Sequence, residues 1–378
     1  MSQAKVLGIA SVLWAFGCGS SNPNPPGLPT GGPNGLAGRP GSGPGTGTGG
    51  GGGTAGSVGV GGAGGANAGA AGVAGAGAPG TGGGAACPGD PLTRCTGTMM
   101  GAWCTETVTP GGLNSFSTMW ANRPDDVWFV GGDFSRGIVP DGTGMYAHFD
   151  GCAWTVTPRP DLPQLNGVWG AAPNDVWIVG TSSNVYHWDG ATLTAFPVQG
   201  ASYFKSVHGT SSTDVWAAGS GIFHWDGITW TQMSASPGND VWAVAPGDAW
   251  VASGTTDALH FTGATFSTTT LTDFGLFSIW SDGTQTYAGG EGEALFRFAG
   301  GTWTTLQGRG GSSEGFVDIG GLGGDVFAVG NGMVVRLSGT TFTPIPDPPS
   351  PPFFRTIWVS PTQTWLGAGN GFVARRVR

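Results

Sequence analysis

The chain has 378 residues, of which 76 are glycine and only 10% are charged, and its formal net charge at pH 7 is −9. Ordinary globular proteins carry roughly 25% charged residues. The negative balance argues against nucleic acid as a partner and against a diffuse electrostatic attraction to anionic lipid. No sequence motif indicates a cofactor, so none is expected.

Residues 1–17 have the pattern of an export signal. Lys5 precedes an apolar run from Val6 to Gly17, which is too short to span a bilayer but suits a signal-peptide core. Gly17 stands directly before Cys18, and this arrangement resembles the lipobox of bacterial lipoproteins. The resemblance implies acylation of Cys18 and, because Gly19 follows it, the outer membrane or the cell surface. The alternative is an ordinary cleaved signal and a secreted protein.

Residues 18–86 are rich in Gly, Ala, Pro, Ser and Thr and contain a single charge, Arg39. So few apolar side chains cannot offset the loss of chain entropy on folding, so this segment is predicted to be a disordered tether. Residues 87–100 form a cysteine-containing lead-in to the folded domain, which is predicted to span 101–378.

An Asp-Val-Trp tripeptide recurs along that domain, in complete or degenerate copies at 126–128, 175–177, 214–216, 248–250, 285–287, 325–327 and 363–365. A period near 40 residues with four short apolar runs per unit is typical of β-propeller blades. In the third unit the four strands are expected at 204–208, 214–218, 221–225 and 228–232. Asp226-Gly227, between the last two strands, predicts a two-residue type I′ turn.

The last unit supplies only three strands before the sequence ends. Residues 101–105, around Trp103, match the fourth strands of other units and are expected to complete the last blade. The predicted fold is therefore an all-β, seven-bladed propeller of four-stranded antiparallel blades, in which an N-terminal strand closes the ring and covers an open sheet edge. The lead-in is expected to arrive from the rim of the a–b and c–d turns, which would then face the membrane.

These motifs, such as Asp175-Val176-Trp177-Ile178-Val179-Gly180 and the segment 224–230 (His-Trp-Asp-Gly-Ile-Thr-Trp), resemble the tandem propeller repeats of bacterial exported lipoproteins, akin to kelch, WD-repeat and tectonin propellers. The resemblance covers residues 101–378. It implies the fold and little about activity.

Four cysteines follow Cys18, and an even number in an exported protein predicts two disulfides. Cys104 and Cys152 are expected on neighbouring blades, more than about 12 Å apart and beyond disulfide reach. Cys87 and Cys95 are therefore predicted to pair with Cys104 and Cys152, in an order that the sequence leaves open.

Strand c carries His at one equivalent position in four blades (His148, His187, His224, His260) and Arg in the other three (Arg297, Arg336, Arg375). Equivalent positions in neighbouring blades would lie roughly 13 Å apart, given strands about 4.8 Å apart. Metal–nitrogen bonds measure about 2 Å, so no metal site is expected. We expect these side chains to bond backbone or neighbouring blades. We expect the Asp residues that open strand b to bond turn amides, and the Trp residues to form the core.

Charged residues that the repeat does not predict fall on the rim of the b–c and d–a loops: Asp133, Arg136, Asp141, Asp257, Glu291, Glu293, Arg309 and Glu314. Variable loops often carry function. The leading hypothesis is a non-catalytic, monomeric, lipid-anchored protein that binds a protein or glycan on this face, because no serine-hydrolase, nucleotide-binding or sialidase motif is present. One alternative is a carbohydrate-active enzyme with Glu291, Glu293 or Glu314 as acid or base. Another is a tectonin-like lectin.

Overall fold

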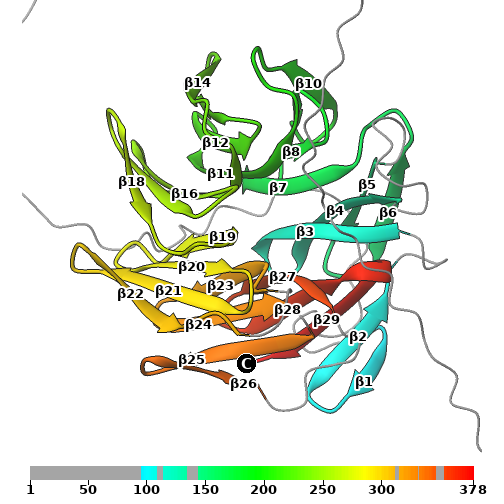
Figure 1. The fold of residues 1–378 in the computed structure, drawn as a ribbon. Coiled ribbons are helices and arrows are strands. Elements are labelled where there is room, and N and C mark those ends of the chain that lie inside the picture. Colours follow the sequence, from blue (N-terminus) through cyan, green and yellow to red (C-terminus); the bar gives the residue numbers. More distant parts are fainter. Residues whose placement is uncertain (1–94, 109–113, 134–143, 311–314, 331, 346–352) are drawn as a thin grey trace, which may run out of the picture. The chain divides into compact units, whose positions relative to one another are not determined.

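The computed structural model describes residues 95–108, 114–133, 144–310, 315–330, 332–345 and 353–378. They form seven antiparallel sheets arranged radially, six with four strands and one with five (Figure 1). The predicted seven-bladed all-β propeller is confirmed. The predicted signal and tether, with Cys18 and Cys87, lie outside the described residues, and no helix in the described part is long and apolar enough to cross a membrane.

Blades 1 to 6 follow one another along the chain. Blade 1 is β3(Asn114–Arg123), β4(Asp126–Asp133), β5(Gly144–Phe149) and β6(Trp154–Arg159). Blade 2 is β7(Leu165–Ala172), β8(Asp175–Gly180), β9(Asn184–Trp188) and β10(Leu193–Pro197). Blade 3 is β11(Phe204–Ser211), β12(Asp214–Gly219), β13(Ile222–Trp225) and β14(Trp230–Ser234).

Blade 4 is β15(Gly238–Ala245), β16(Asp248–Ser253), β17(Asp257–Thr262) and β18(Phe266–Thr270). Blade 5 is β19(Leu276–Ser281), β20(Thr286–Gly290), β21(Ala294–Ala299) and β22(Thr302–Gln307). Blade 6 is β23(Asp318–Leu322), β24(Asp325–Gly330), β25(Met333–Ser338) and β26(Thr341–Pro344). Blade 7 combines β27(Phe354–Val359), β28(Gln363–Ala368) and β29(Phe372–Val377) with β2(Trp103–Thr107) and β1(Thr98–Met100).

The core lies between neighbouring blades. Each innermost strand contacts the innermost strand of the next blade, and β27 contacts β3, so the circle is complete. An apolar residue within two positions of the start of these strands is buried in six blades, as Phe116, Leu165, Phe204, Leu276, Phe316 and Phe354. Burying a large apolar side chain contributes about 1.5–3 kcal/mol, so each interface is stabilised mainly by the hydrophobic effect.

Glycine permits close approach between successive blades. A Cβ atom on Gly170 would lie 2.7 Å from the ring of Trp120, and one on Gly209 would lie 2.7 Å from the ring of Trp169. These Trp rings come from the innermost strand of the preceding blade. At each of these two interfaces, a Trp ring of one blade therefore packs directly against a Gly of the next blade, where a larger residue would not fit.

Blade 7 closes the ring as predicted, with one strand more than expected. β2 pairs with β29, with Trp103 opposite Arg376 and Thr107 opposite Phe372. The unpredicted β1 pairs with β2, with Thr98 opposite Thr105. Because β1 runs antiparallel to β2, residues 96–98 approach alongside the later residues of β2. The predicted arrival from the a–b/c–d rim is therefore wrong for these residues.

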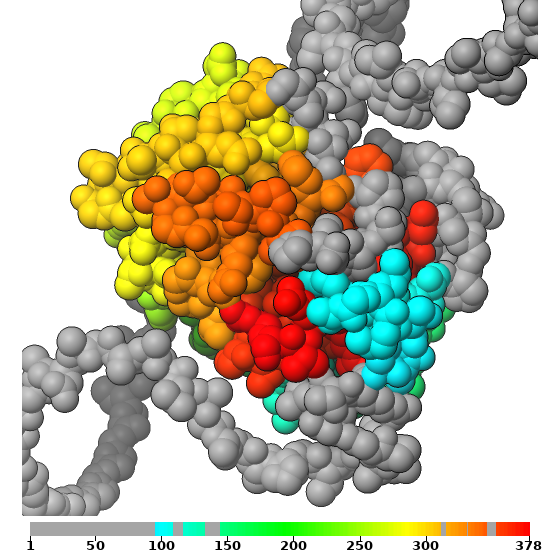
Figure 2. Space-filling view, turned by 90° about the horizontal axis from the view of Figure 1, so that it is seen from below, coloured from blue at the N-terminus to red at the C-terminus, as the bar shows by residue number. Residues whose placement is uncertain are grey.

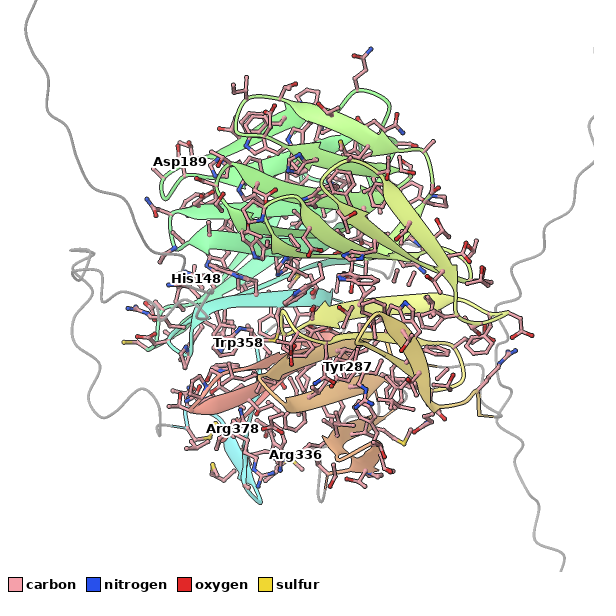
Figure 3. The ribbon with its side chains drawn as sticks, turned by 90° about the vertical axis from the view of Figure 1, so that its left-hand side faces the viewer. His148, Asp189, Tyr287, Arg336, Trp358 and Arg378 are labelled. Carbon is pink, nitrogen blue, oxygen red and sulfur yellow. A yellow bond between two sulfur atoms is a disulfide. The ribbon has the colours of Figure 1, made fainter. Side chains whose placement is uncertain are left out.

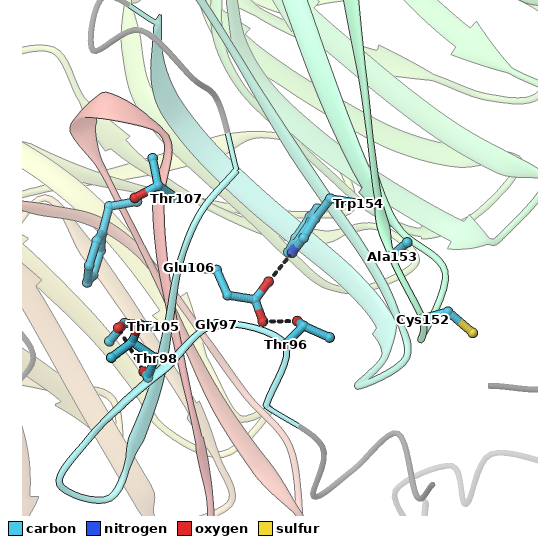
Figure 4. A pocket seen from close by; sticks show the side chains of 10 residues that line it. Thr96, Gly97, Thr98, Thr105, Glu106, Thr107, Cys152, Ala153 and Trp154 are labelled. Carbon is cyan, nitrogen blue, oxygen red and sulfur yellow. Dashed lines mark hydrogen bonds between the residues drawn. The ribbon is translucent and has the colours of Figure 1, made fainter. Parts of the chain in front are cut away.

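The seam between blades 7 and 1 is joined by Glu106 (Figure 4). One carboxylate oxygen accepts a bond of 2.8 Å from the Trp154 indole N–H of blade 1, and the other accepts from the Thr96 hydroxyl. Arg375 of β29 lies 3.8 Å from Glu106. One side chain thus ties the lead-in, the closing strand and the first blade together.

The disulfide prediction is confirmed where it can be checked. Cys95 is bonded to Cys104, with the Cα atoms 5.5 Å apart, so Cys104 is not bonded to Cys152. Cys152 is also disulfide-bonded. The pairing predicted for Cys87 lies outside the described residues.

The Asp-Gly hairpins differ from the prediction. Trp225 pairs with Trp230, so four residues rather than two form the connection in blade 3. Gly227 has φ 91°, whereas Asp226 is not among the residues with positive φ, so the type I′ assignment is wrong. The Asp226 carboxylate instead accepts the amides of Ile228 and Thr229, at 2.9 and 2.8 Å. Asp150 and Asp189 do the same in their own turns.

Candidate functional site

Each of the four strand-c histidines bonds the aspartate that opens strand b of its own blade. The Nε2–Oδ1 distances are 2.8 Å for His148–Asp126 (His148 is labelled in Figure 3), 2.7 Å for His187–Asp175, 2.6 Å for His224–Asp214 and 2.8 Å for His260–Asp248. Each His ring also lies 3.7–4.4 Å from the ring of the Trp two residues after that aspartate.

For the four histidines, the expected bonds to backbone or to neighbouring blades are therefore wrong. The turn amides expected for Asp126, Asp175 and Asp214 are wrong as well. The register explains why: Trp128 stands directly opposite His148, and Asp126 projects from the same face of the strand as Trp128. Asp126 is thus the nearest acceptor for the ring. Within the described ranges, no group of three His, Cys, Asp or Glu side chains could hold a metal ion.

The pocket that best suits a binding role lies where the innermost strands begin. It has a cavity volume of about 150 Å³ and is lined by residues from all seven blades. Its charged and polar members include Asn166, Lys205, Asn239, Asp240, Asp318 and Arg355. We call this pocket the axial mouth. It opens toward the b–c and d–a loops, the rim chosen from the sequence.

Two carboxyl groups, both partly buried, line the axial mouth. Asp240 accepts 2.6 Å from the Ser206 hydroxyl and 2.8 Å from the amide of Ile279 in the next blade. Burial raises the pKa of Asp240 to about 6, although these bonds act in the opposite direction. Burial, and secondly the charge of Asp240, raise the pKa of Asp318 to about 7. Asp318 accepts 2.9 Å from the amide of Ile357 in the next blade. Both carboxyls thus join neighbouring blades.

The two cations of the axial mouth, Lys205 and Arg355, are exposed. The Lys205 ammonium donates to the Asn239 side chain over 2.5 Å. No described residue forms an ion pair with Lys205 or Arg355. Phe277 lies on blade 5, between Asp240 and Asp318 in ring order, and the exposed Val317 directly precedes Asp318 on blade 6. The mouth therefore offers two cationic donors beside an apolar wall.

The structure brings together three of the rim residues predicted from the sequence. Arg309 binds the Glu291 carboxylate over 2.5 Å and lies 5.0 Å from the centre of the Phe274 ring. Glu293 stands two residues after Glu291 in the same loop and has φ 60°, a strained value for a residue with a side chain. The Glu291 amide donates to the Gly275 carbonyl, two residues before Phe277, so this group borders the axial mouth.

The other rim residues are not joined to that group. Asp257 accepts 2.7 Å from the Thr270 hydroxyl and 3.0 Å from the Thr256 hydroxyl, as a local link within blade 4. Only the backbone of Asp133 is described, as the last residue of β4. Arg136, Asp141 and Glu314 lie outside the described residues.

Sequence reasoning missed every charged residue of the axial mouth. A signal was present within the first three residues of the innermost strands, where Lys205, Asp240, Asp318 and Arg355 stand in place of the Ser, Thr, Asn or Gly of other blades. These residues lie within strands, whereas the binding face was predicted from charged residues in loops.

No protein-family model matches the chain, and no curated protein matches it. Similar solved structures include YCF48 bound to D1 peptide, with 16% identity and a TM-score of 0.58, covering 75% of this chain and 97% of that chain. Catalytically inactive virginiamycin B lyase from Staphylococcus aureus with quinupristin has 10% identity and a TM-score of 0.60, covering 73% and 99%. The WD40 β-propeller domain of Doa1 has 14% identity and a TM-score of 0.57, covering 70% and 93%. These similarities establish a shared fold.

Proposed function

We propose that this protein is a non-catalytic binding protein that receives an acidic side chain of a partner protein in the axial mouth. The observation that carries the proposal is the pair of cations, Lys205 and Arg355, at one small pocket without a carboxylate partner among the described residues. Charge-assisted bonds from Lys or Arg to a carboxylate are about twice as strong as neutral ones.

The size of the pocket favours a single side chain over a free small molecule. Its volume of about 150 Å³ lies below the 300–1,000 Å³ of typical small-molecule sites. Phe277 and Val317 would contact the apolar part of the same anchor residue. Asp240 and Asp318 are less available as ligand acceptors, because they already accept bonds from the backbone of the next blade. The fold of a propeller bound to a peptide, YCF48, supports this role.

The enzyme alternative has weaker support. The Glu291 carboxylate is held in an ion pair with Arg309, so it would have to leave that partner before it could act on a substrate. A glycan ligand is the other alternative, and the glycan array described below tests it.

We also propose, from the sequence pattern at Cys18, that a lipid anchor holds the protein at the outer membrane or cell surface. Metabolic labelling with a fatty-acid analogue tests this, and labelling that persists in Cys18→Ser would contradict it.

The binding proposal is tested by selecting peptides from a random displayed library on the full chain and measuring their affinities by calorimetry. Selected peptides should be enriched in Asp or Glu. Lys205→Ala and Arg355→Ala should each weaken binding by at least about tenfold, since a charged hydrogen bond contributes about 1.5–3 kcal/mol. Arg123→Ala is the matched control, because Arg123 lies at the end of β3 on the opposite rim and is paired with Asp125.

Three results would overturn the proposal. The first is selection of peptides that lack acidic residues. The second is an affinity that is unchanged in both Lys205→Ala and Arg355→Ala. The third is a glycan array that yields ligands which both variants still bind. The last result would favour the lectin.

A further inference from the structure

A second groove lies at the interface of blades 6 and 7, away from the axial mouth. Its cavity volume is about 590 Å³, within the range of typical ligand sites. Strands β24, β25 and β26 of blade 6 and strands β2, β28 and β29 of blade 7 supply its lining. In Figure 2 the C-terminal strand lies against the closing strand and against blade 6 on one face.

Three guanidinium groups line this groove, those of Arg336, Arg376 and Arg378. Arg336 donates over 2.5 Å to one oxygen of Asp325, and Arg378 is paired with the other oxygen. Arg336 and Arg378 are labelled in Figure 3. Arg378 also donates 2.9 Å to the Ser360 carbonyl. Arg376 forms no ion pair with any described residue. One carboxylate therefore faces three cations, in a chain whose net charge is −9.

Aromatic rings hold these guanidinium groups. Arg336 and Arg378 lie 5.7 and 5.9 Å from the centre of the Phe327 ring, and Arg376 lies 6.0 Å from the centre of the Trp103 ring. A guanidinium stacked on a ring still presents its N–H edge, which matches the oxygens of carboxylate or phosphate. The groups are thus positioned before any ligand arrives.

The fold itself does not require this concentration of charge. At the equivalent place in blades 1 to 4, the aspartate of strand b bonds a histidine, and those blades form the same four-stranded sheet. Blade 6 has Asp325 with Arg336, and blade 7 adds Arg376 of β29 and Arg378 directly after that strand. A departure from the repeat that leaves excess charge in a groove indicates recognition rather than packing.

We propose that this groove binds a phosphomonoester group attached to an apolar or planar body. Three guanidinium groups less one carboxylate leave two positive charges among these four side chains, which matches a phosphomonoester carrying about −1.5 to −2 at pH 7. A carboxylate ligand would leave one positive charge uncompensated. The rings of Phe327 and Trp103, with Ile345 and Pro344, supply apolar surface for the body of the ligand.

The test titrates the full chain with phenyl phosphate and with inorganic phosphate, by calorimetry at low salt. Phenyl phosphate is expected to bind at least tenfold more tightly than inorganic phosphate, and more weakly at pH 5 than at pH 7.5, because its second ionisation has a pKa near 6. Arg376→Gln should lower its affinity about tenfold without changing thermal stability. Arg336→Gln should do the same with some loss of stability, whereas Arg123→Gln should change nothing.

A second arm distinguishes a soluble phosphate ester from a lipid headgroup. Vesicles of phosphatidylcholine with phosphatidic acid are compared with pure phosphatidylcholine in a flotation assay. Flotation that depends on phosphatidic acid and is lost in Arg376→Gln assigns the site to a lipid, and phenyl phosphate binding without flotation assigns it to a soluble ester. Failure of both probes, or binding unchanged in Arg376→Gln, overturns the proposal without affecting the axial mouth.

Discussion

The carboxylate of Asp240 accepts a hydrogen bond of 2.8 Å from the backbone amide of Ile279 in the next blade. Asp318 of blade 6 likewise accepts from the amide of Ile357 in blade 7. The Thr356 hydroxyl of blade 7 accepts from the amide of Met119 in blade 1, across the ring closure. The innermost strands are therefore joined by side chains that bridge to the backbone of the following blade. In two blades those side chains can ionise, which makes the stability of the ring sensitive to pH.

Asp318→Asn should remove part of that sensitivity. The folded-state pKa of Asp318, about 7, lies above the unfolded value near 3.9, so the folded state binds more protons between these values. The contribution of Asp318 to stability is fully present below pH 4 and is lost as the pH rises through about 7. The melting temperature of Asp318→Asn minus that of the wild type should therefore increase from pH 5 to pH 8.

Asp226→Asn is the control for that measurement. Bonds from the amides of Thr229 and Ile228 lower the pKa of Asp226, so its contribution is lost as the pH falls. The two variants should show opposite trends. A difference between Asp318→Asn and wild type that stays constant with pH would refute the raised pKa.

Asp214→Ala should destabilise the fold more than Asp248→Ala, although both remove the partner of a strand-c histidine. The Asp214 side chain is 9% exposed and that of Asp248 is 40% exposed. Leaving a buried polar group without its partner costs about 1–3 kcal/mol, whereas water replaces the partner at an exposed position. Urea denaturation measures both losses, and equal losses would contradict this account.

Trp103→Ala should weaken ring closure. Trp103 is 2% exposed and belongs to the strand that completes blade 7, and truncating a buried Trp costs about 3–5 kcal/mol. Freeing the edge of β29 should also produce oligomers in size-exclusion chromatography. Trp303→Ala, in the corresponding strand of blade 5, is the control, because Trp303 is only half-buried and closes no ring. Similar losses in both variants would argue against a special role for β2.

Local patterns predicted much of the fold because each blade repeats its own short-range signals. The Asp-Val-Trp copies located every strand b, and the similarity between residues 101–105 and the other fourth strands located the closing strand. The same local reasoning missed β1, whose three residues are all exposed and show no alternation of apolar side chains. It also assigned the wrong partners to the strand-c histidines, because strand register, and not composition, sets those partners.

The sequence by itself determined the number of blades, the closure of the ring and the exclusion of a Cys104–Cys152 disulfide, since all three follow from a period counted along the chain. Only the tertiary structure decided which charged side chains meet. Lys205 and Arg355 stand 150 positions apart in the sequence, and Asp325 and Arg378 stand 53 apart, yet each pair lines one cavity. A radial fold brings residues of separate repeats together at a common axis or interface. The pattern within a single repeat does not predict which of these residues come into contact.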